Sequence, residues 1–217
     1  MSGFADLLLL ALIVVDLYIV ASSRLVGCVR ATALQGALLA FLPVALWSGD
    51  PSADLLHIGL MSVGTWILKA VVIPILLMRA IRTSGAHREV EPFVSLHLSL
   101  LLAAALVGVS FWFASVLRLP RPAPSDLLIP AAFATLFLGS LVLVSRRKAI
   151  TQVVGYLMIE NGVFVFGQTL AREIPFAVEL GILLDLLVGV FVMGIAIHHI
   201  SREFDHIDTE RLATLRD

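Results

Sequence analysis

Long apolar runs recur along this chain of 217 residues, and they constrain its fold more than any other feature. A helix rises 1.5 Å per residue, so about 20 apolar residues are enough to cross the roughly 30 Å hydrocarbon core of a bilayer. Backbone polar groups in hydrocarbon must bond within their own segment, which makes helices the expected structure. With 59% hydrophobic and 14% charged residues, the chain is predicted to be an all-α, polytopic membrane protein.

About seven transmembrane helices are expected from these runs. The runs cover residues 4–21, 31–48, 56–78, 94–116, 126–144, 149–170 and 176–200. The second is the weakest, because Gln35 and Pro43 interrupt it and Arg30 and Asp50 bound it closely. A six-span alternative leaves this segment in the membrane interface.

The distribution of Lys and Arg between alternate loops predicts the orientation of the chain. One side carries eleven of these residues, namely Arg24, Arg30, Arg79, Arg82, Arg88, Arg146, Arg147, Lys148, Arg202, Arg211 and Arg216. The other side carries Arg118, Arg121 and Arg172. Cytoplasmic loops hold the excess of positive charge, so we expect the N-terminus outside and the C-terminus in the cytoplasm.

A proline-rich segment divides the sequence. Residues 118–125 contain Pro120, Pro122 and Pro124, which favour a stiff, extended connector over a helix. The connector separates a four-helix front half, residues 1–117, from a three-helix back half, residues 126–200. The charged residues 201–217 are predicted to form a short cytoplasmic tail.

Two carboxylates are expected near the middle of the bilayer. Glu160 lies about eleven residues into its run and Asp185 about ten into the next, so both are roughly 15 Å deep and can meet. Hydrocarbon leaves an ionised carboxylate without water unless protein supplies a polar pocket. Asn161 and Gly162 beside Glu160 would supply an amide and room for a neighbouring helix or water. Glu179 would form the mouth of the same path.

A lysine is also expected in mid-membrane. Lys69 lies in the third run, and Pro74 leaves the carbonyl of Ala70 without its usual donor and predicts a kink. A buried lysine beside a carboxylate is a pairing from which proton relays are built, because each charge alters the protonation of the other. Asp16, about twelve residues into the first run, is a further candidate. Static ion pairs that fix helix packing are the alternative reading of all these residues.

The sequence shows no catalytic motif. A glycine-rich phosphate loop, an HExxH pair, a CxxC pair and a nucleophile elbow are all missing. The single cysteine, Cys28, cannot make a disulfide within the chain or a metal site by itself. The balance of 15 basic and 16 acidic residues gives no sign of a nucleic-acid surface. We therefore predict a non-catalytic chain with no cofactor or metal site of its own.

Several ordered motifs resemble membrane component E of hydrogenase-4, a family in the membrane arms of formate hydrogenlyase-type nickel–iron hydrogenases. The resemblance rests on Ser145–Lys148, Gly155–Gly162, Pro175–Asp185, Ile207–Arg216, and on Lys69 and Pro74 in the front half. The back half is more distantly similar to the K subunit of complex I and the C subunit of multisubunit antiporters. Those subunits carry a membrane glutamate in each of their last two helices. Asp185 matches the second, whereas Leu157 stands at the first and Glu160 follows nearly one turn later.

The resemblance implies a non-catalytic subunit within a larger complex of the bacterial inner membrane. Its membrane partners would be antiporter-like and quinone-pocket-like subunits, and its cytoplasmic partners nickel–iron hydrogenase and iron–sulfur subunits. We hypothesise that Glu160, Asp185 and Lys69 form part of a proton path in that membrane arm. The alternatives are a scaffold whose buried charges only dock neighbouring subunits, or a subunit of a cation/proton antiporter-like module. A free-standing secondary transporter is disfavoured because no paired internal repeats are visible.

Overall fold

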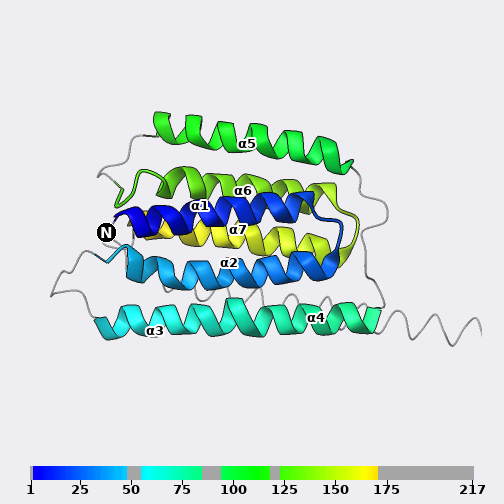
Figure 1. The fold of residues 1–217 in the computed structure, drawn as a ribbon, viewed down its shortest axis with the longest axis horizontal. Helices are drawn as coiled ribbons and strands as arrows, with labels where there is room; N and C mark the ends of the chain where they lie inside the picture. Colours follow the sequence, from blue (N-terminus) through cyan, green and yellow to red (C-terminus); the bar gives the residue numbers. More distant parts are fainter. Residues whose placement is uncertain (1, 48–54, 85–93, 118–122, 171–217) are drawn as a thin grey trace, which may run out of the picture.

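The computed structural model describes residues 2–47, 55–84, 94–117 and 123–170 (Figure 1). Within these ranges the regular structure is helical and contains no strand. The elements are α1 (Ser2–Ala21), α2 (Leu25–Ala45), α3 (Leu55–Thr65), η1 (Trp66–Val72), α4 (Ile73–Ser84), α5 (Leu96–Val116), α6 (Leu128–Ser145) and α7 (Ala149–Leu170). Figure 1 shows them aligned side by side as a bundle.

Six stretches of the described chain are helices long and apolar enough to cross a membrane. They are Gly3–Ala21, Leu25–Ala45, Ile58–Arg82, Leu96–Val116, Leu128–Ser145 and Ala149–Thr169, the third of which combines α3, η1 and α4. The predicted seventh span at 176–200 lies outside the described residues, as do Glu179, Asp185 and the tail at 201–217. The all-helical, membrane-spanning fold class agrees with the structure, and the count of seven stays a prediction.

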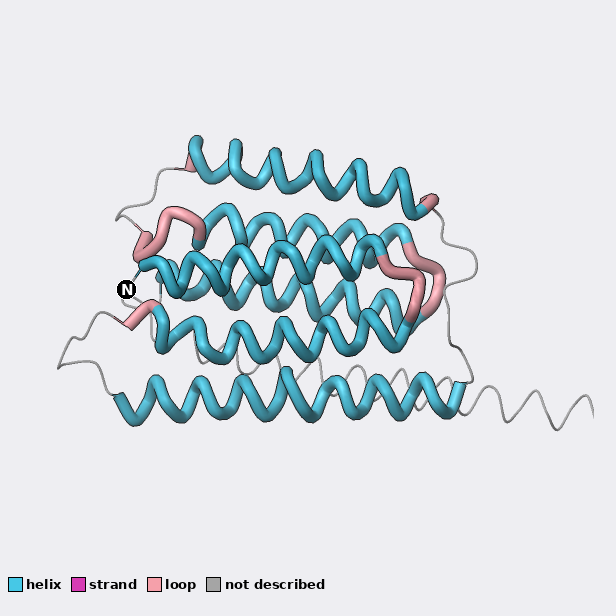
Figure 2. The backbone as a smooth tube through the Cα atoms, viewed as in Figure 1, coloured by secondary structure: helices cyan, strands magenta, loops and turns pink. Residues whose placement is uncertain are grey.

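The helices alternate in direction along the bundle. Figure 2 shows the α1–α2 and α6–α7 connections at the same end, which is also the end that α4 reaches. In the described ranges, the basic residues of the predicted cytoplasmic loops therefore lie toward this end, namely Arg24, Arg30, Arg79, Arg82, Arg146, Arg147 and Lys148. Which end faces the cytoplasm stays a prediction.

The second helix begins earlier than the sequence analysis placed it. It starts at Leu25, directly after an extended Arg24, and ends at Ala45, whereas we expected residues 31–48. No proline separates Leu25 from residue 31, and the exposed Arg30 can extend its charge from the first turns of a helix. Arg30 thus belongs to α2 and not to the loop. Pro43 lies in the last turn, and α2 packs inside the bundle against α1, η1 and α7, which argues against the interfacial alternative.

A π-helical segment interrupts the third span where we expected a kink. Residues Trp66–Val72 form η1, with Lys69 at its centre. Pro74 has no N–H to donate to the carbonyl of Ala70, and the N–H of Ile73 bonds the carbonyl of Leu68, five residues back. Such π turns accommodate a disrupted hydrogen-bond ladder and occur frequently at functional sites. In the view of Figure 1, α3, η1 and α4 continue as one rod.

Glycines bring α6 and α7 into close contact. A Cβ atom at Gly155 would lie 2.6 Å from the backbone nitrogen of Leu143, and one at Gly162 would lie 2.8 Å from that of Leu136. These separations leave no room for a side chain, so the two helices meet backbone to backbone. Gly162, predicted to admit a neighbouring helix or water, therefore has a helix-packing role.

Helices from both sides of the proline-rich connector share one core. Its buried apolar residues come from α1, α2, α4, α5, α6 and α7 and include Ile19, Val29, Leu77, Leu138 and Met158. Within this arrangement α5 contacts α6 and α1 and is mostly exposed, as expected for a helix that faces lipid or a partner. The division into two halves at 118–125 stays a prediction about the sequence.

Candidate functional site: a buried polar network

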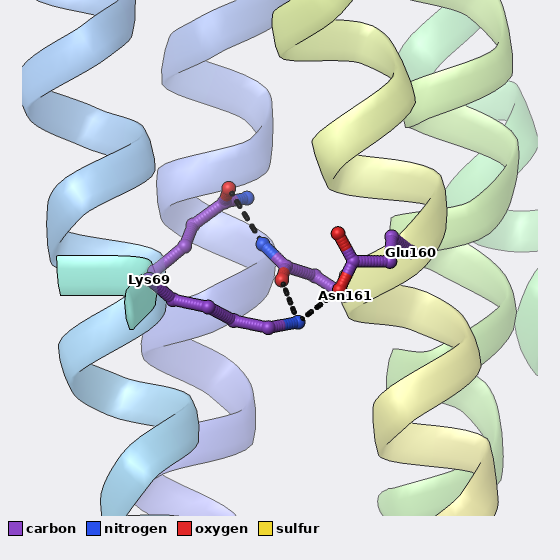
Figure 3. A network of polar contacts seen from close by, with 4 residues as sticks. Lys69, Glu160 and Asn161 are labelled. Carbon is purple, nitrogen blue, oxygen red and sulfur yellow. Dashed lines mark hydrogen bonds and ion pairs between the residues drawn. The ribbon is translucent and has the colours of Figure 1, made fainter. Parts of the chain in front are cut away.

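An ion pair joins the third span to α7 inside the bundle. The Nζ atom of Lys69 lies 2.6 Å from Oε1 of Glu160 and 2.9 Å from Oδ1 of Asn161 (Figure 3). The side chains of Lys69 and Glu160 are 5% and 4% exposed. The ring of Phe164 has its centroid 5.1 Å from Nζ, which adds a cation–π contact. Three predicted residues thus meet at one point.

The backbone around Lys69 is held close to α2. A Cβ atom at Gly36 would lie 2.5 Å from the carbonyl carbon of Lys69, so only glycine permits this approach. Because Lys69 enters the bundle from the π-helical segment, its side chain runs past α2 toward α7, as Figure 3 shows. Gly36 and η1 together place the ammonium group at Glu160 and Asn161.

The network continues from Asn161 to Asp16 through the side chain of Gln35. Nδ2 of Asn161 donates to Oε1 of Gln35 at 3.3 Å, and Nε2 of Gln35 donates to Oδ1 of Asp16. The hydroxyl of Thr135 donates to Oδ2 of the same carboxylate at 2.7 Å. We call the six residues Asp16, Gln35, Lys69, Thr135, Glu160 and Asn161 the polar network. Its members come from α1, α2, η1, α6 and α7.

The two carboxylates of the polar network differ in their surroundings. Both oxygens of Asp16 accept hydrogen bonds from neutral donors. Glu160 accepts from Lys69 through Oε1, whereas its buried Oε2 has no hydrogen-bond partner among the described residues. A buried carboxylate oxygen without a donor is costly, so Oε2 is the atom of the network at which a proton or a further donor can bind.

Sequence reasoning missed Gln35 and Thr135 as members of the site. Gln35 was treated only as an interruption of an apolar run, although a carboxamide at that depth has to find a polar partner. Thr135 gave no comparable signal, because a threonine hydroxyl commonly bonds the backbone of its own helix. Only the approach of α1 to α6 directs it toward Asp16.

Arg146 lies in the expected connection between α6 and α7, but it is buried. We counted it as a loop charge on the cytoplasmic side, yet it is 2% exposed and its Nη2 donates to the carbonyl of Val20 at 2.6 Å. Val20 lies in the last turn of α1, where carbonyls lack partners within the helix. Arg146 therefore ties the end of α1 to the end of α6.

The polar network thus gathers Lys69, Glu160, Asp16 and Asn161, while Pro74 follows the π-helical segment that carries Lys69. In the described ranges no three His, Cys, Asp or Glu side chains converge as metal ligands. Hydrogen bonds connect two carboxylates, an ammonium group and two amides in this arrangement.

Comparison with known proteins shows a family to which the chain belongs. It is 33% identical over 207 residues to a Mycobacterium tuberculosis protein named "Uncharacterized protein Rv0085", and the alignment covers 95% of this chain and 93% of that protein. The chain belongs to the same family as Rv0085. No protein-family profile and no solved structure matches it.

Two more distant relatives of the chain carry a functional name. The chain is 27% identical over 155 residues to hydrogenase-4 component E of Escherichia coli strain K12, with 71% of this chain and 72% of that protein covered. Component E of Shigella flexneri matches with the same figures. The predicted relation to component E is thus confirmed as distant homology. This homology and the six apolar helices together support a multi-pass membrane protein.

Proposed function

We propose that this chain is a non-catalytic membrane subunit of a hydrogenase-4 or formate hydrogenlyase-type complex. In this role it contributes to a proton-translocating membrane arm in the bacterial inner membrane and anchors an electron-transfer arm. Antiporter-like and quinone-pocket-like subunits are its membrane partners, and nickel–iron hydrogenase and iron–sulfur subunits lie on the cytoplasmic side. The distant homology to component E supports this assignment.

The observation that carries the proton-moving role is the Lys69–Glu160 ion pair inside the bundle. Ionisable groups within membrane spans are costly to insert and are typical of ion and proton pathways. The pair is also connected to Asp16, so a change of charge at one group alters the protonation of the others. In the proposed mechanism, redox events in the electron-transfer arm shift a neighbouring charge, and the polar network responds by binding or releasing a proton.

The substitution Glu160→Gln tests this mechanism. Gln keeps the size of the side chain and can still accept from Lys69, but it cannot exchange a proton. We expect the tagged subunit to co-purify with its partners in normal amounts, while proton uptake by inverted membrane vesicles falls by at least about tenfold. The matched control is Asp126→Asn, which neutralises an exposed carboxylate and should leave uptake unchanged. Normal uptake in Glu160→Gln would exclude Glu160 from the path.

Asp185 and Glu179 belong to the same proposed path, although they lie outside the described residues. If Asp185 is its next carboxylate, Asp185→Asn should assemble normally and lose proton uptake as strongly as Glu160→Gln does. The same vesicle measurement checks it. Intact assembly and intact uptake together would remove Asp185 from the proposal.

A scaffold is the second candidate, and the continuous hydrogen bonding from Lys69 to Asp16 favours it. Lys69, Asn161, Gln35 and Asp16 form an unbroken series of donors and acceptors, as static networks do. In that case Lys69 or Glu160 variants lose assembly, and whatever assembles still translocates normally.

Affinity purification in mild detergent with mass spectrometry tests the parent complex itself. Recovery of a nickel–iron hydrogenase large subunit with antiporter-like chains supports the proposal. Recovery of antiporter-like chains alone points instead to a cation/proton antiporter-like module, and recovery of the chain by itself points to a free-standing transporter.

A further inference from the structure

The two amide side chains between Lys69 and Asp16 are oriented in the same direction. Asn161 accepts from Lys69 through its oxygen and donates through its nitrogen, and Gln35 repeats this pattern toward Asp16. Reversing Asn161 would turn its NH2 group against the ammonium group. Reversing Gln35 would turn its oxygen against the carboxylate. The ammonium group at one end and the carboxylate at the other therefore determine both orientations.

Every hydrogen bond along this route is donated in the direction from Lys69 to Asp16. We call Asn161 and Gln35 the amide bridge. Its two dipoles are aligned with the field between the ammonium group and the carboxylate, so they stabilise both charges at once. The four residues are between 0% and 4% exposed, and at that burial water screens their interaction only weakly.

One ammonium group serves two carboxylates in the polar network. Glu160 contacts Lys69 directly, and Asp16 reaches it through the amide bridge. Among the described residues, neither carboxylate has another ion-pair partner. If all three groups are ionised, the network holds one excess negative charge, and it is neutral when one carboxylate holds a proton. An uncompensated buried charge is strongly unfavourable, so a single proton suits this set of groups.

We propose that the amide bridge makes Asp16 a second counter-ion of Lys69, so that Asp16 and Glu160 are alternative charged partners of one ammonium group. Whichever carboxylate is neutral, the other remains charged and balances Lys69. Gln35 and Asn161 are positioning residues in this arrangement, because they act through Asp16 and Lys69. The electrostatic coupling follows from the geometry alone, while its use in moving protons rests on the proposed function.

A cycle of single and double variants of the full-length protein in mild detergent tests the coupling. Asp16→Asn and Glu160→Gln each retain the shape of the side chain and leave one carboxylate of the polar network for Lys69, so each should lower the melting temperature only slightly. The double variant leaves Lys69 with neither. We expect its melting temperature to fall by at least about 3 °C more than the sum of the two single effects.

The same cycle in a Gln35→Leu background tests the bridge itself. Leu has a similar volume and cannot connect Asn161 to Asp16, so the effects of the two carboxylate variants should become additive. Thr135→Val is the matched control, because Thr135 also donates to Asp16 but lies off the amide bridge. In that background the extra loss should persist.

Two results would overturn the inference: additive effects in the otherwise unchanged protein, or an extra loss that survives Gln35→Leu. If Gln35→Leu does not accumulate, Asn161→Leu breaks the amide bridge from its other end. If neither variant accumulates, the cycle of Asp16→Asn and Glu160→Gln in the otherwise unchanged protein decides. Melting temperatures do not depend on proton uptake. Failure of the proposed function, seen as normal uptake in Glu160→Gln, is therefore distinguishable from failure of the coupling.

Discussion

Lys69→Met is expected to remove most of the folded protein from the membrane. The substitution keeps an apolar chain of similar length but leaves Glu160 and Asp16 without the ammonium group that both contact, directly or through amides. Removing one partner of a buried ion pair costs about 3–5 kcal/mol. That is a large share of the roughly 5–15 kcal/mol that stabilises a typical domain. The measurement is the amount of tagged protein in membranes, with its melting temperature in mild detergent.

Two further variants show whether the loss comes from the charge. Arg30→Met removes an exposed cation from α2 and should leave both the amount and the melting temperature unchanged. Adding Glu160→Gln to Lys69→Met removes the carboxylate left without its partner and should restore part of the stability. Wild-type amounts of Lys69→Met with an unchanged melting temperature would show that the ion pair is dispensable for folding.

Gly36→Ala is expected to be the most disruptive addition of a single methyl group in the described chain. The new Cβ atom would lie 2.5 Å from the carbonyl carbon of Lys69 and 2.7 Å from its carbonyl oxygen. These are backbone atoms of a packed helix, so α2 and η1 have to move apart. Overpacking of this kind costs about 1–3 kcal/mol, or roughly 3–10 °C in melting temperature for a chain of this length. The shift also draws Lys69 away from Glu160.

Gly64→Ala is the matched control for this prediction. Gly64 lies in α3, in the same membrane span as Lys69, and a Cβ atom there meets nothing within 4 Å. Alanine is a better helix former than glycine, so the melting temperature should stay the same or rise slightly. Equal behaviour of Gly36→Ala and Gly64→Ala would show that the close approach of α2 to η1 does not constrain the fold.

Helix positions followed closely from the sequence wherever apolar length alone decided them. The runs expected at 94–116 and 126–144 correspond to Leu96–Val116 and Leu128–Ser145. The early start of α2 was missed because Arg30 was treated as a boundary, although an arginine can lie in the first turns of a helix with its charge extended. Arg146 was placed correctly in a loop, but nothing in the sequence indicated that its side chain is buried and bonds the end of another helix.

The candidate site was predictable in its components but not in its connections. Charged residues in apolar runs stand out because hydrocarbon penalises them, which identified Lys69, Glu160 and Asp16. Gln35 and Thr135 are neutral, so the sequence gave them much weaker signals. Their membership depends on which helices are neighbours, and that information is absent from any single run.

The depth of a residue in the membrane depends on its own helix, whereas the direction in which its side chain points depends on the neighbouring helices. The sequence can therefore predict the first, and only the tertiary structure shows the second. The sequence by itself determined that the chain forms membrane-length helices and that several charges lie deep within them, because rise per residue and apolar length are local properties. The tertiary structure alone decided that Lys69 pairs with Glu160, 91 residues away, and reaches Asp16 through two amides. That choice depends on backbone contacts between separate helices, such as Gly36 against Lys69, where the space left by a missing side chain sets how each helix is turned.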